Sequence, residues 1–201
     1  MSAGTSSNEN IAPAVIMSLA KELRKLSCEP LDGIKVQLNE DDVTDICAEI
    51  TGPDQTPFEG GVFKIKLVLP SDYPQAPPKG FFLTRIYHPN ISKAGEICVN
   101  TLKKDWQATL GVGHVLQVVR CLLINPFPES ALNEEAGKDF MEDYEEYTKK
   151  AKMFTEVHAR PKAAASSDSA EGEPLEKKQK PVDAKAAEKR KAEKKKSLKR
   201  L

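Results

Sequence analysis

The sequence predicts an α+β fold, in which one N-terminal helix precedes a four-stranded antiparallel meander and C-terminal helices follow it. Three observations lead to this prediction. Apolar residues recur at helical spacing near the N-terminus and again after residue 111. Between residues 34 and 85, four short segments read as strands, and residues 51–61 carry turn-forming Pro, Asp and Gly. Four consecutive strands after one helix suggest a sheet with the helix packed on it.

The first helix is predicted over residues 11–26, after a small, polar and flexible start at residues 1–10. Its apolar positions recur at helical spacing, and they are Val15, Ile16, Leu19, Leu23 and Leu26. Three basic residues lie among them: Lys21, Arg24 and Lys25. By themselves, such charges are typical of a solvated helix face.

Four strands are predicted next, and the third has the clearest pattern. Apolar residues alternate there with Lys64 and Lys66, as in an antiparallel strand with one buried and one exposed face. The second strand places Ile46, Ala48 and Ile50 on one face. The predicted ranges are residues 34–38, 43–50, 62–69 and 79–85.

A long ordered loop and further helices complete the predicted fold. Residues 88–109 show no convincing period, and loops of that length in compact domains are often functional. A helix is predicted over residues 112–124, ended by Pro126. Residues 132–158 are predicted to be helical again, as one helix or two. The expected buried stripe of this last segment is Leu132, Ala136, Phe140, Tyr144, Tyr147, Ala151 and Phe154.

The charge distribution divides the chain. The total of 30 basic and 30 acidic residues gives a net charge of zero. Residues 1–159 hold 16 basic and 23 acidic residues, whereas residues 160–201 hold 14 and 7. The second segment has no aromatic residue and few aliphatic ones, so it cannot bury enough apolar surface to offset its ordering entropy. We therefore predict a folded core over residues 11–158 and a disordered Lys-rich tail over 159–201.

Composition excludes several classes of protein. No apolar run approaches the roughly 18–20 residues that a membrane helix needs, and the first residues lack the basic start and apolar stretch of a secretory signal. Four scattered cysteines without a C-x-x-C pair favour neither a disulfide scaffold nor a zinc site. Glycine patterns that cradle nucleotide phosphates are absent. We expect no metal and no membrane partner, and a reducing intracellular location in the cytoplasm or nucleus.

Cys98 is the candidate nucleophile among the four cysteines. A lone cysteine is usually a small buried hydrophobic residue, and Cys47 and Cys121 fit that description because they lie in a predicted strand and a predicted helix. Cys98 instead lies in the aperiodic stretch. A cysteine hydrolase also needs a histidine base and a residue that orients it, and no orienting partner for His88 is evident.

Five blocks of the sequence occur in the order and at the spacing of one known family. They are GPDQTPFEGGVF, the Pro-rich LPSDYPQAPPKGFF, His88-Pro89-Asn90, GEICVN and Trp106. Together, over about residues 11–158, they resemble the catalytic core of ubiquitin-conjugating enzymes. The tripeptide alone would be a weak signal, whereas five blocks in register are a specific one.

The resemblance implies a chemistry for Cys98. In this family the cysteine accepts the C-terminal carboxyl of ubiquitin from the activating enzyme as a thioester, which a substrate lysine then attacks. A thioester is already activated, so the reaction needs a positioned amine and a stabilised oxyanion rather than a triad base. By resemblance, Asn90 either donates to the oxyanion or braces the loop, and His88 and Pro89 hold the loop's shape. No bound cofactor is expected, since the activating enzyme consumes the ATP.

The sequence also departs from the common family pattern. Val99 follows the cysteine where many members have leucine, and W-Q-A stands at Trp106 where W-S-P is common. Many members carry an acid in the gate loop that favours a neutral lysine amine, and here that position is Ser130. Glu134 either docks the acceptor ubiquitin or merely favours the first turn of a helix. The acceptor ubiquitin itself is another possible source of the acid.

The resemblance also implies surfaces for the two earlier steps. In this family the helix predicted at 112–124 holds the donor ubiquitin, and the candidates on it are Gln117, Cys121 and Ile124. A core position is the alternative for the last two. The first helix docks on the activating enzyme in this family, which gives Lys21, Arg24 and Lys25 a second interpretation. Lys103 lies five residues after Cys98 on the same loop. Because proximity raises effective concentration, we predict its self-modification in cis.

Further blocks narrow the resemblance to one subgroup. KKDW, PFPESALNEEAG, EDYEEYTKKA and the Lys-rich end resemble members that elongate ubiquitin chains with the anaphase-promoting complex, a ubiquitin ligase. This implies chains through the eleventh residue of ubiquitin, a lysine, and a role in proteasomal degradation and mitotic exit. The last residues combine two apolar anchors with two charges, and we predict that they dock on the ligase: Leu198, Lys199, Arg200 and Leu201.

Two other functions account for parts of the sequence. A non-catalytic ubiquitin-binding variant of the family would lack the cysteine, whereas Cys98 is present in its expected block. A basic nucleic-acid-binding arm would explain the lysines of residues 185–201. That segment has no aromatic residues for base stacking and nothing to read a base sequence, so nucleic acid is not the expected partner.

Overall fold

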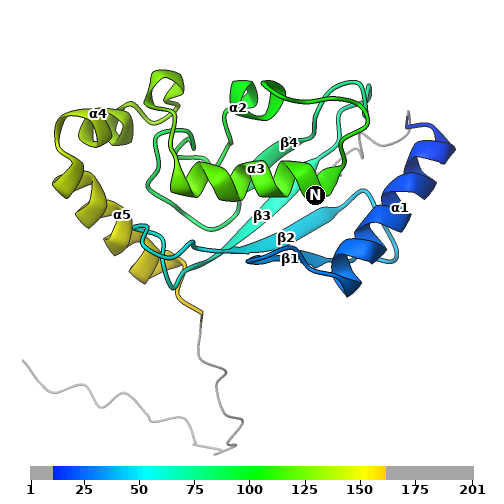
Figure 1. Ribbon diagram of the computed structural model, residues 1–201, viewed down its shortest axis with the longest axis horizontal. Coiled ribbons are helices and arrows are strands. Elements are labelled where there is room, and N and C mark those ends of the chain that lie inside the picture. The colour runs from blue at the N-terminus through cyan, green and yellow to red at the C-terminus, as the bar shows by residue number, and fades with distance from the viewer. Residues whose placement is uncertain (1–10, 162–201) are drawn as a thin grey trace, which may run out of the picture. The chain divides into compact units, whose positions relative to one another are not determined.

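The computed structural model describes residues 11–161, which form a four-stranded sheet with helices packed around it (Figure 1). The strand order is β1-β2-β3-β4, and each neighbouring pair is antiparallel. The predicted meander and the predicted α+β class are therefore confirmed. The strands are β1 (Ile34–Gln37), β2 (Ile46–Thr51), β3 (Val62–Val68) and β4 (Lys79–Phe82).

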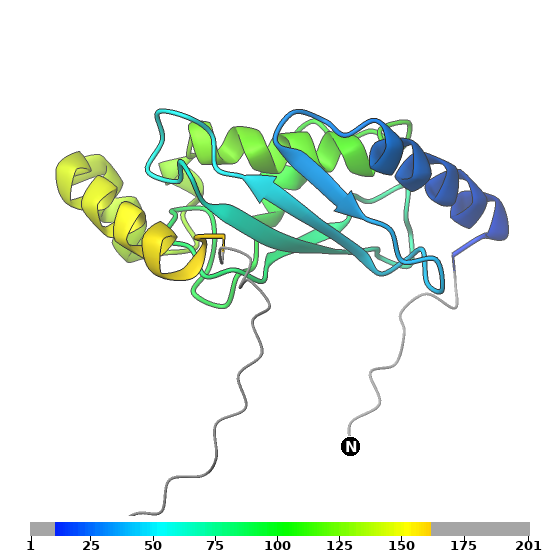
Figure 2. The same cartoon turned by 90° about the horizontal axis from the view of Figure 1, so that it is seen from below.

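The helices occupy three places around the sheet. Figures 1 and 2 show α3 across one face of it, α1 at one end, and α4 and α5 at the opposite end. A short α2 and a 3₁₀ turn, η1, lie in the connections near α3. The bounds are α1 (Pro13–Cys28), α2 (Val99–Lys103), α3 (Val112–Ile124), η1 (Pro128–Ser130), α4 (Glu134–Glu142) and α5 (Tyr144–His158).

The hydrophobic core lies between the sheet and α3. On β2 the apolar residues at alternate positions are buried, and Ala48 pairs with Ile65 and Ile50 with Phe63 across the sheet. One face of the sheet is thus continuously apolar, as the alternation predicted. The side of α3 that meets this face buries Val112, Val115, Leu116, Val119, Leu122 and Leu123.

The first helix joins the core through the predicted stripe. Leu19, Leu23 and Leu26 are buried, and Pro13 occupies the first turn, where a missing N–H costs nothing. Glu22, from the same helix, accepts a hydrogen bond from the backbone N–H of Gly113 at 3.0 Å. This carboxylate satisfies an otherwise unpaired donor at the start of α3 and ties the two helices together.

The loop predicted after residue 88 contains a helix that the sequence did not indicate. Residues 99–103 form α2, and Leu102 is its only buried residue. A five-residue helix is too short to show a period. The preceding strand is also shorter than predicted, since β4 ends at Phe82 and Leu83 is 59% exposed.

The C-terminal helical segment consists of two helices. Asp143 ends α4 and caps α5, because its side chain accepts a hydrogen bond from the N–H of Glu146. The predicted stripe is wrong at two positions. Leu132 lies before α4 begins and is 45% exposed, and Tyr144 begins α5 and is 57% exposed. The change of helix direction at residue 143 breaks the period that the stripe assumed.

Within residues 11–161 no helix is long and apolar enough to span a bilayer. The same residues contain no group of three or more His, Cys, Asp or Glu side chains placed to hold a metal ion.

Candidate active site

Cys98 lies directly before α2 and is 5% exposed. Its backbone N–H donates to the carbonyl of Asn90 at 3.0 Å, and its own carbonyl accepts from the N–H of Thr101 at 3.1 Å. The chain between residues 90 and 98 turns back on itself, since Ile91 and Ile97 form an antiparallel bridge. The thiol is therefore held by backbone contacts on both sides. We call residues 87–98 the cysteine segment.

One glycine makes this turn possible. Gly95 has a φ of +94°, a conformation that side chains rarely adopt. A Cβ at this position would lie 2.2 Å from the carbonyl oxygen of Phe82. The N–H of Phe82 in turn donates to the carbonyl of Gly95 at 2.8 Å. The cysteine segment thus packs closely against the end of β4.

His88 is fully buried in the cysteine segment. One ring nitrogen, Nε2, donates to the carbonyl of Leu122 at 3.0 Å, and the other, Nδ1, accepts from the N–H of Asn90 at 3.0 Å. Burial lowers the pKa of the imidazole to about 4, which the hydrogen bond to Leu122 opposes only in part. Both nitrogens are occupied and the ring is neutral, so His88 is not placed to serve Cys98 as a base.

The Asn90 side chain forms hydrogen bonds to one neighbouring loop through both its amide nitrogen and its amide oxygen. Its Nδ2 donates to the carbonyls of Phe127 at 2.6 Å and Ser130 at 3.1 Å. Its Oδ1 accepts from the N–H of Phe127 at 2.8 Å. Of the two expected roles, oxyanion donor or loop brace, this geometry corresponds to the brace.

Pro89 adds a second attachment to the same loop. Its carbonyl accepts from the N–H groups of Leu132 at 2.8 Å and Asn133 at 3.0 Å. We call residues 127–133 the gate segment. Five hydrogen bonds from two consecutive residues therefore hold the gate segment beside the cysteine segment.

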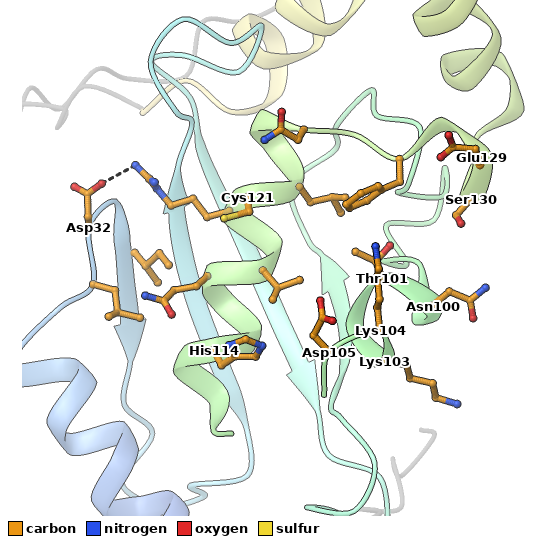
Figure 3. A pocket seen from close by; sticks show the side chains of 18 residues that line it. Asp32, Asn100, Thr101, Lys103, Lys104, Asp105, His114, Cys121, Glu129 and Ser130 are labelled. Atoms are coloured by element: carbon orange, nitrogen blue, oxygen red, sulfur yellow. Dashed lines mark hydrogen bonds and ion pairs between the residues drawn. The ribbon is translucent and has the colours of Figure 1, made fainter. Parts of the chain in front are cut away.

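A groove of about 940 Å³ lies next to these segments. Figure 3 shows α3 in the middle of the lining residues, with Asp32 on one side of it and α2 with the gate segment on the other. Gln117 and Cys121 line the groove and are exposed. Ile124 is 45% exposed, one turn further along α3. The core alternative for Cys121 and Ile124 is therefore wrong, because both lie on the helix face opposite the core.

Ser130 and Glu134 lie at the two ends of a short connection. Ser130 ends η1, is half-buried and lines the groove. Glu134 is the exposed first residue of α4, whose N-cap Asn133 accepts from the N–H of Ala136 at 3.3 Å. An acid in a first helical turn also favours the helix dipole. Both readings of Glu134, acceptor contact and helix start, remain predictions.

Three other sets of predicted residues lie elsewhere. Lys103 is the exposed last residue of α2, so it belongs to a helix and not to the loop that was predicted, although it lines the groove (Figure 3). Exposed side chains on α1 include Lys21, Arg24 and Lys25. The ligase-docking residues lie outside the residues that the structure describes: Leu198, Lys199, Arg200 and Leu201.

Two contacts at this site were not anticipated. The Lys104 ammonium lies over the Phe127 ring, 5.4 Å from its centroid, which links the end of α2 to the gate segment. Tyr87, at the start of the cysteine segment, donates to Asp139 of α4 at 2.6 Å. Sequence spacing gives no signal for either, since the partners are 23 and 52 residues apart.

Stability should depend on pH through His88. Because the folded state holds this ring neutral, the unfolded state alone binds its proton between about pH 4 and 6.5. The free energy of unfolding should therefore be highest above pH 6.5 and fall by up to ~3 kcal/mol as the pH drops to about 4. Urea unfolding at a series of pH values across this range measures the free energy of unfolding. This free energy should change less with pH in His88→Gln than in the wild type. An NMR titration that protonates the wild-type ring near pH 6.5 would contradict this account.

Comparison with known proteins assigns the chain to a family. Residues 18–155 match the family described as ubiquitin-conjugating enzyme. The chain is 57% identical to ubiquitin-conjugating enzyme E2 S of Nematostella vectensis over 203 residues, which cover 99% of this chain and all of that protein. It is 60% identical to ubiquitin-conjugating enzyme E2 22 of Arabidopsis thaliana over 156 residues, 78% of this chain and 62% of that protein.

A solved structure has a similar fold. The crystal structure of a putative ubiquitin conjugating enzyme from Plasmodium yoelii superimposes with a TM-score of 0.69 at 32% identity. The match covers 75% of this chain and 99% of the other. The residues matched by the family, 18–155, include the cysteine segment, the groove and the gate segment. The chain therefore belongs to the ubiquitin-conjugating enzymes, ubiquitin transferases that work with ubiquitin, a ubiquitin-activating enzyme and a ubiquitin ligase.

Proposed function

We propose that the chain accepts ubiquitin as a thioester on Cys98 and elongates polyubiquitin chains through the eleventh residue of ubiquitin, a lysine. The ligase in this proposal is the anaphase-promoting complex, and the outcome is proteasomal degradation during mitotic exit. The observation that carries the proposal is the placement of Cys98, whose backbone is bonded to Asn90 and which directly precedes α2, a helix that lines the groove. The linkage and the ligase rest on the resemblance of the sequence blocks to the chain-elongating subgroup.

Charging is an exchange between two thioesters. The Cys98 thiolate attacks the carbonyl carbon of ubiquitin on the activating enzyme, a new carbon–sulfur bond forms as the old one breaks, and the cysteine of the activating enzyme leaves as a thiolate. The energy comes from ATP consumed upstream. Since a thiolate attacks and a thiolate leaves, no histidine has to protonate the leaving group. The buried, fully bonded His88 is compatible with such a reaction.

Transfer to lysine breaks the bond that charging made. The neutral acceptor amine attacks the thioester carbonyl, a carbon–nitrogen bond forms, Cys98 leaves as the thiolate, and the amine gives up a proton. The gate segment offers Ser130 where many family members have an acid. An acid contributed by the acceptor ubiquitin would meet this need, with Glu134 on α4 available to dock that ubiquitin.

The groove suits the donor ubiquitin. Its α3 side presents Gln117 and Cys121 and its other side presents α2, so an extended C-terminal peptide could lie along it toward Cys98. Lys103 on α2 borders the same groove, which keeps it a candidate for modification in cis. The exposed basic face of α1 is separate from the residues that line the groove and is free for the activating enzyme.

Linkage analysis tests this proposal directly. The isolated protein, with activating enzyme, ATP and ubiquitin, should form chains whose branched peptides carry mainly the eleventh-residue linkage. Ubiquitin with arginine at its eleventh residue should still charge the enzyme but should support little chain formation. Chains of mixed linkage, or equal chain formation with the arginine variant, would refute the proposed specificity while leaving the transferase activity intact.

The tail should matter only when the ligase is present. Leu198 and Leu201 each contribute up to ~1.5–3 kcal/mol if fully buried on a partner, whereas the attraction of lysines alone is screened beyond about 10 Å in physiological salt. A tether to the ligase also raises the effective concentration of the core near the growing chain. Removing residues 198–201 should leave thioester formation and free chain synthesis unchanged and sharply weaken ligase-stimulated elongation.

Two variants separate the leucines from the charges. Leu198→Ala with Leu201→Ala keeps the net charge and should reproduce most of the truncation. Neutralising Lys194, Lys195 and Lys196 keeps both leucines and should have the smaller effect. If the leucine variant elongates normally with the ligase and the lysine variant does not, the anchor is electrostatic.

A further inference from the structure

A polar network joins the cysteine segment to both C-terminal helices. Tyr87 donates to Oδ2 of Asp139 at 2.6 Å, and the Lys150 ammonium donates to the same oxygen at 2.7 Å. Lys150 also lies 3.6 Å from Oε1 of Glu135. Glu135 in turn pairs through Oε2 with Lys93 at 3.3 Å. Two points of the cysteine segment are thus connected to two points of α4, with Lys150 of α5 between them.

The network contacts α4 where it can fix the position and rotation of that helix. Glu135 and Asp139 are four residues apart, so both project from one side of that helix. The apolar contacts of α4 come from Ala136 and Gly137, which are buried, and from Phe140, which is half-buried and lies edge-on to the rings of Tyr144 and Tyr147 of α5. These contacts attach α4 to α5, whereas the polar contacts of Glu135 and Asp139 also connect α4 to the cysteine segment.

The inner part of the network is stronger than the outer part. The Lys150 and Asp139 side chains are 29% and 18% exposed, whereas Lys93 and Glu135 are 78% and 53% exposed. Exposed ion pairs contribute little because water and salt screen them. The hydrogen bonds from Lys150 and then Tyr87 lower the pKa of Asp139, and the bond to Asp139 raises the pKa of Lys150. The inner pair is therefore charged at neutral pH.

We propose that Lys150 is a positioning residue that holds α4 against the cysteine segment and thereby sets how the acceptor ubiquitin approaches Cys98. The proposal rests on the proposed function, in which Glu134 docks that ubiquitin. Glu134 precedes Glu135 in the first turn of α4, so any rotation of the helix moves both. The groove assigned to the donor is lined by none of Tyr87, Asp139 or Lys150. Lys150 should therefore affect the acceptor step and not the donor.

Three variants of two adjacent lysines test the proposal. Lys150→Met removes the charge and keeps much of the side-chain volume. Lys150→Arg keeps a donor that can reach both carboxylates and should restore wild-type behaviour. Lys149→Met is the matched control, because Lys149 is 82% exposed and only approaches Glu146, at 3.9 Å. For each protein, three rates are measured: charging, discharge of the thioester to free lysine, and diubiquitin formation at increasing acceptor concentration.

Lys150→Met should raise the KM for acceptor ubiquitin about three- to fivefold, as expected for loss of a partly exposed ion pair. Its kcat, its charging and its discharge to free lysine should stay within about twofold of the wild type, because a small amine needs no docking surface. An unchanged acceptor KM would overturn the proposal. So would an equal loss in all three rates, which would indicate general damage to the fold.

Hydrogen exchange tests, without any ubiquitin, the claim that Lys150 holds α4 in place. In Lys150→Met, the amides of residues 134–142 should exchange faster while those of α3 do not, and Lys149→Met should match the wild type. Unchanged exchange in α4 would refute the positioning claim. A wild-type protein that charges but forms no diubiquitin would instead refute the proposed function and the acceptor role with it, and exchange would still decide whether Lys150 holds α4.

Discussion

Replacing Cys98 with alanine should abolish charging and leave the fold intact. The contacts that hold this residue use its backbone N–H and carbonyl, which alanine retains. Losing one buried sulfur atom should cost on the order of 1 kcal/mol. Cys98→Ser should instead trap an oxyester, which resists thiols and is a poorer acyl donor. Gel analysis with and without reductant, after incubation with activating enzyme, ATP and ubiquitin, distinguishes the three proteins.

Cys121 provides the matched control for this prediction. It is an exposed free thiol, as Cys28 is, but it also lines the groove proposed for the donor ubiquitin. Cys121→Ser should form a reducible thioester as the wild type does, although more slowly if this residue contacts the donor. Thiol-sensitive charging that persists in Cys98→Ala would move the nucleophile to Cys121, Cys28 or Cys47.

Asn90→Ala should destabilise the protein as well as slow transfer. The change leaves the N–H of Phe127 and the carbonyl of Ser130 without their Asn90 partner. The carbonyl of Phe127 also loses its bond from Asn90 but keeps the one from the N–H of Ser130 at 3.0 Å. Since buried groups without partners each cost about 1–3 kcal/mol and water can reach some of these, we expect a loss of ~2–4 kcal/mol in the free energy of unfolding. Urea unfolding measures that loss, and single-turnover discharge to free lysine should fall with it.

The same substitution at an exposed asparagine is the control. Asn100 is exposed on α2, and Asn100→Ala should keep the wild-type free energy of unfolding. If Asn90 is instead an oxyanion donor, Asn90→Ala should affect transfer and not stability. If that variant unfolds like the wild type and charges normally, yet discharges to lysine hundreds of times more slowly, the amide acts on the transition state and the brace is secondary.

The fold was predictable where one face of an element is buried. Alternation in the third strand and the apolar stripe of α1 come from contact with a single core, so period and burial agree. The prediction failed where the sequence has no period that follows the burial of the side chains. α2 is too short to have a period, and the turn at Asp143 changes the helix axis, which leaves Tyr144 outside the stripe.

Only those residues of the site that lie in short sequence motifs could be predicted. The resemblance singled out Cys98 and the tripeptide His88-Pro89-Asn90, because these residues lie close together along the chain. It did not reveal what Asn90 touches, since Phe127 and Ser130 are 37 and 40 residues away. The bond from Tyr87 to Asp139 joins residues 52 apart. Such contacts depend on how elements meet in space, which no local pattern records.

A single-turnover chase tests most directly whether the chain carries ubiquitin and passes it on. Enzyme charged with labelled ubiquitin is separated from ATP and activating enzyme, and unlabelled acceptor ubiquitin is then added. We predict that the thioester, mapped by peptide mass spectrometry to Cys98, disappears at the same rate as labelled diubiquitin appears. Diubiquitin that forms without loss of this thioester, or a Cys98 thioester that decays only to free ubiquitin, would contradict the account.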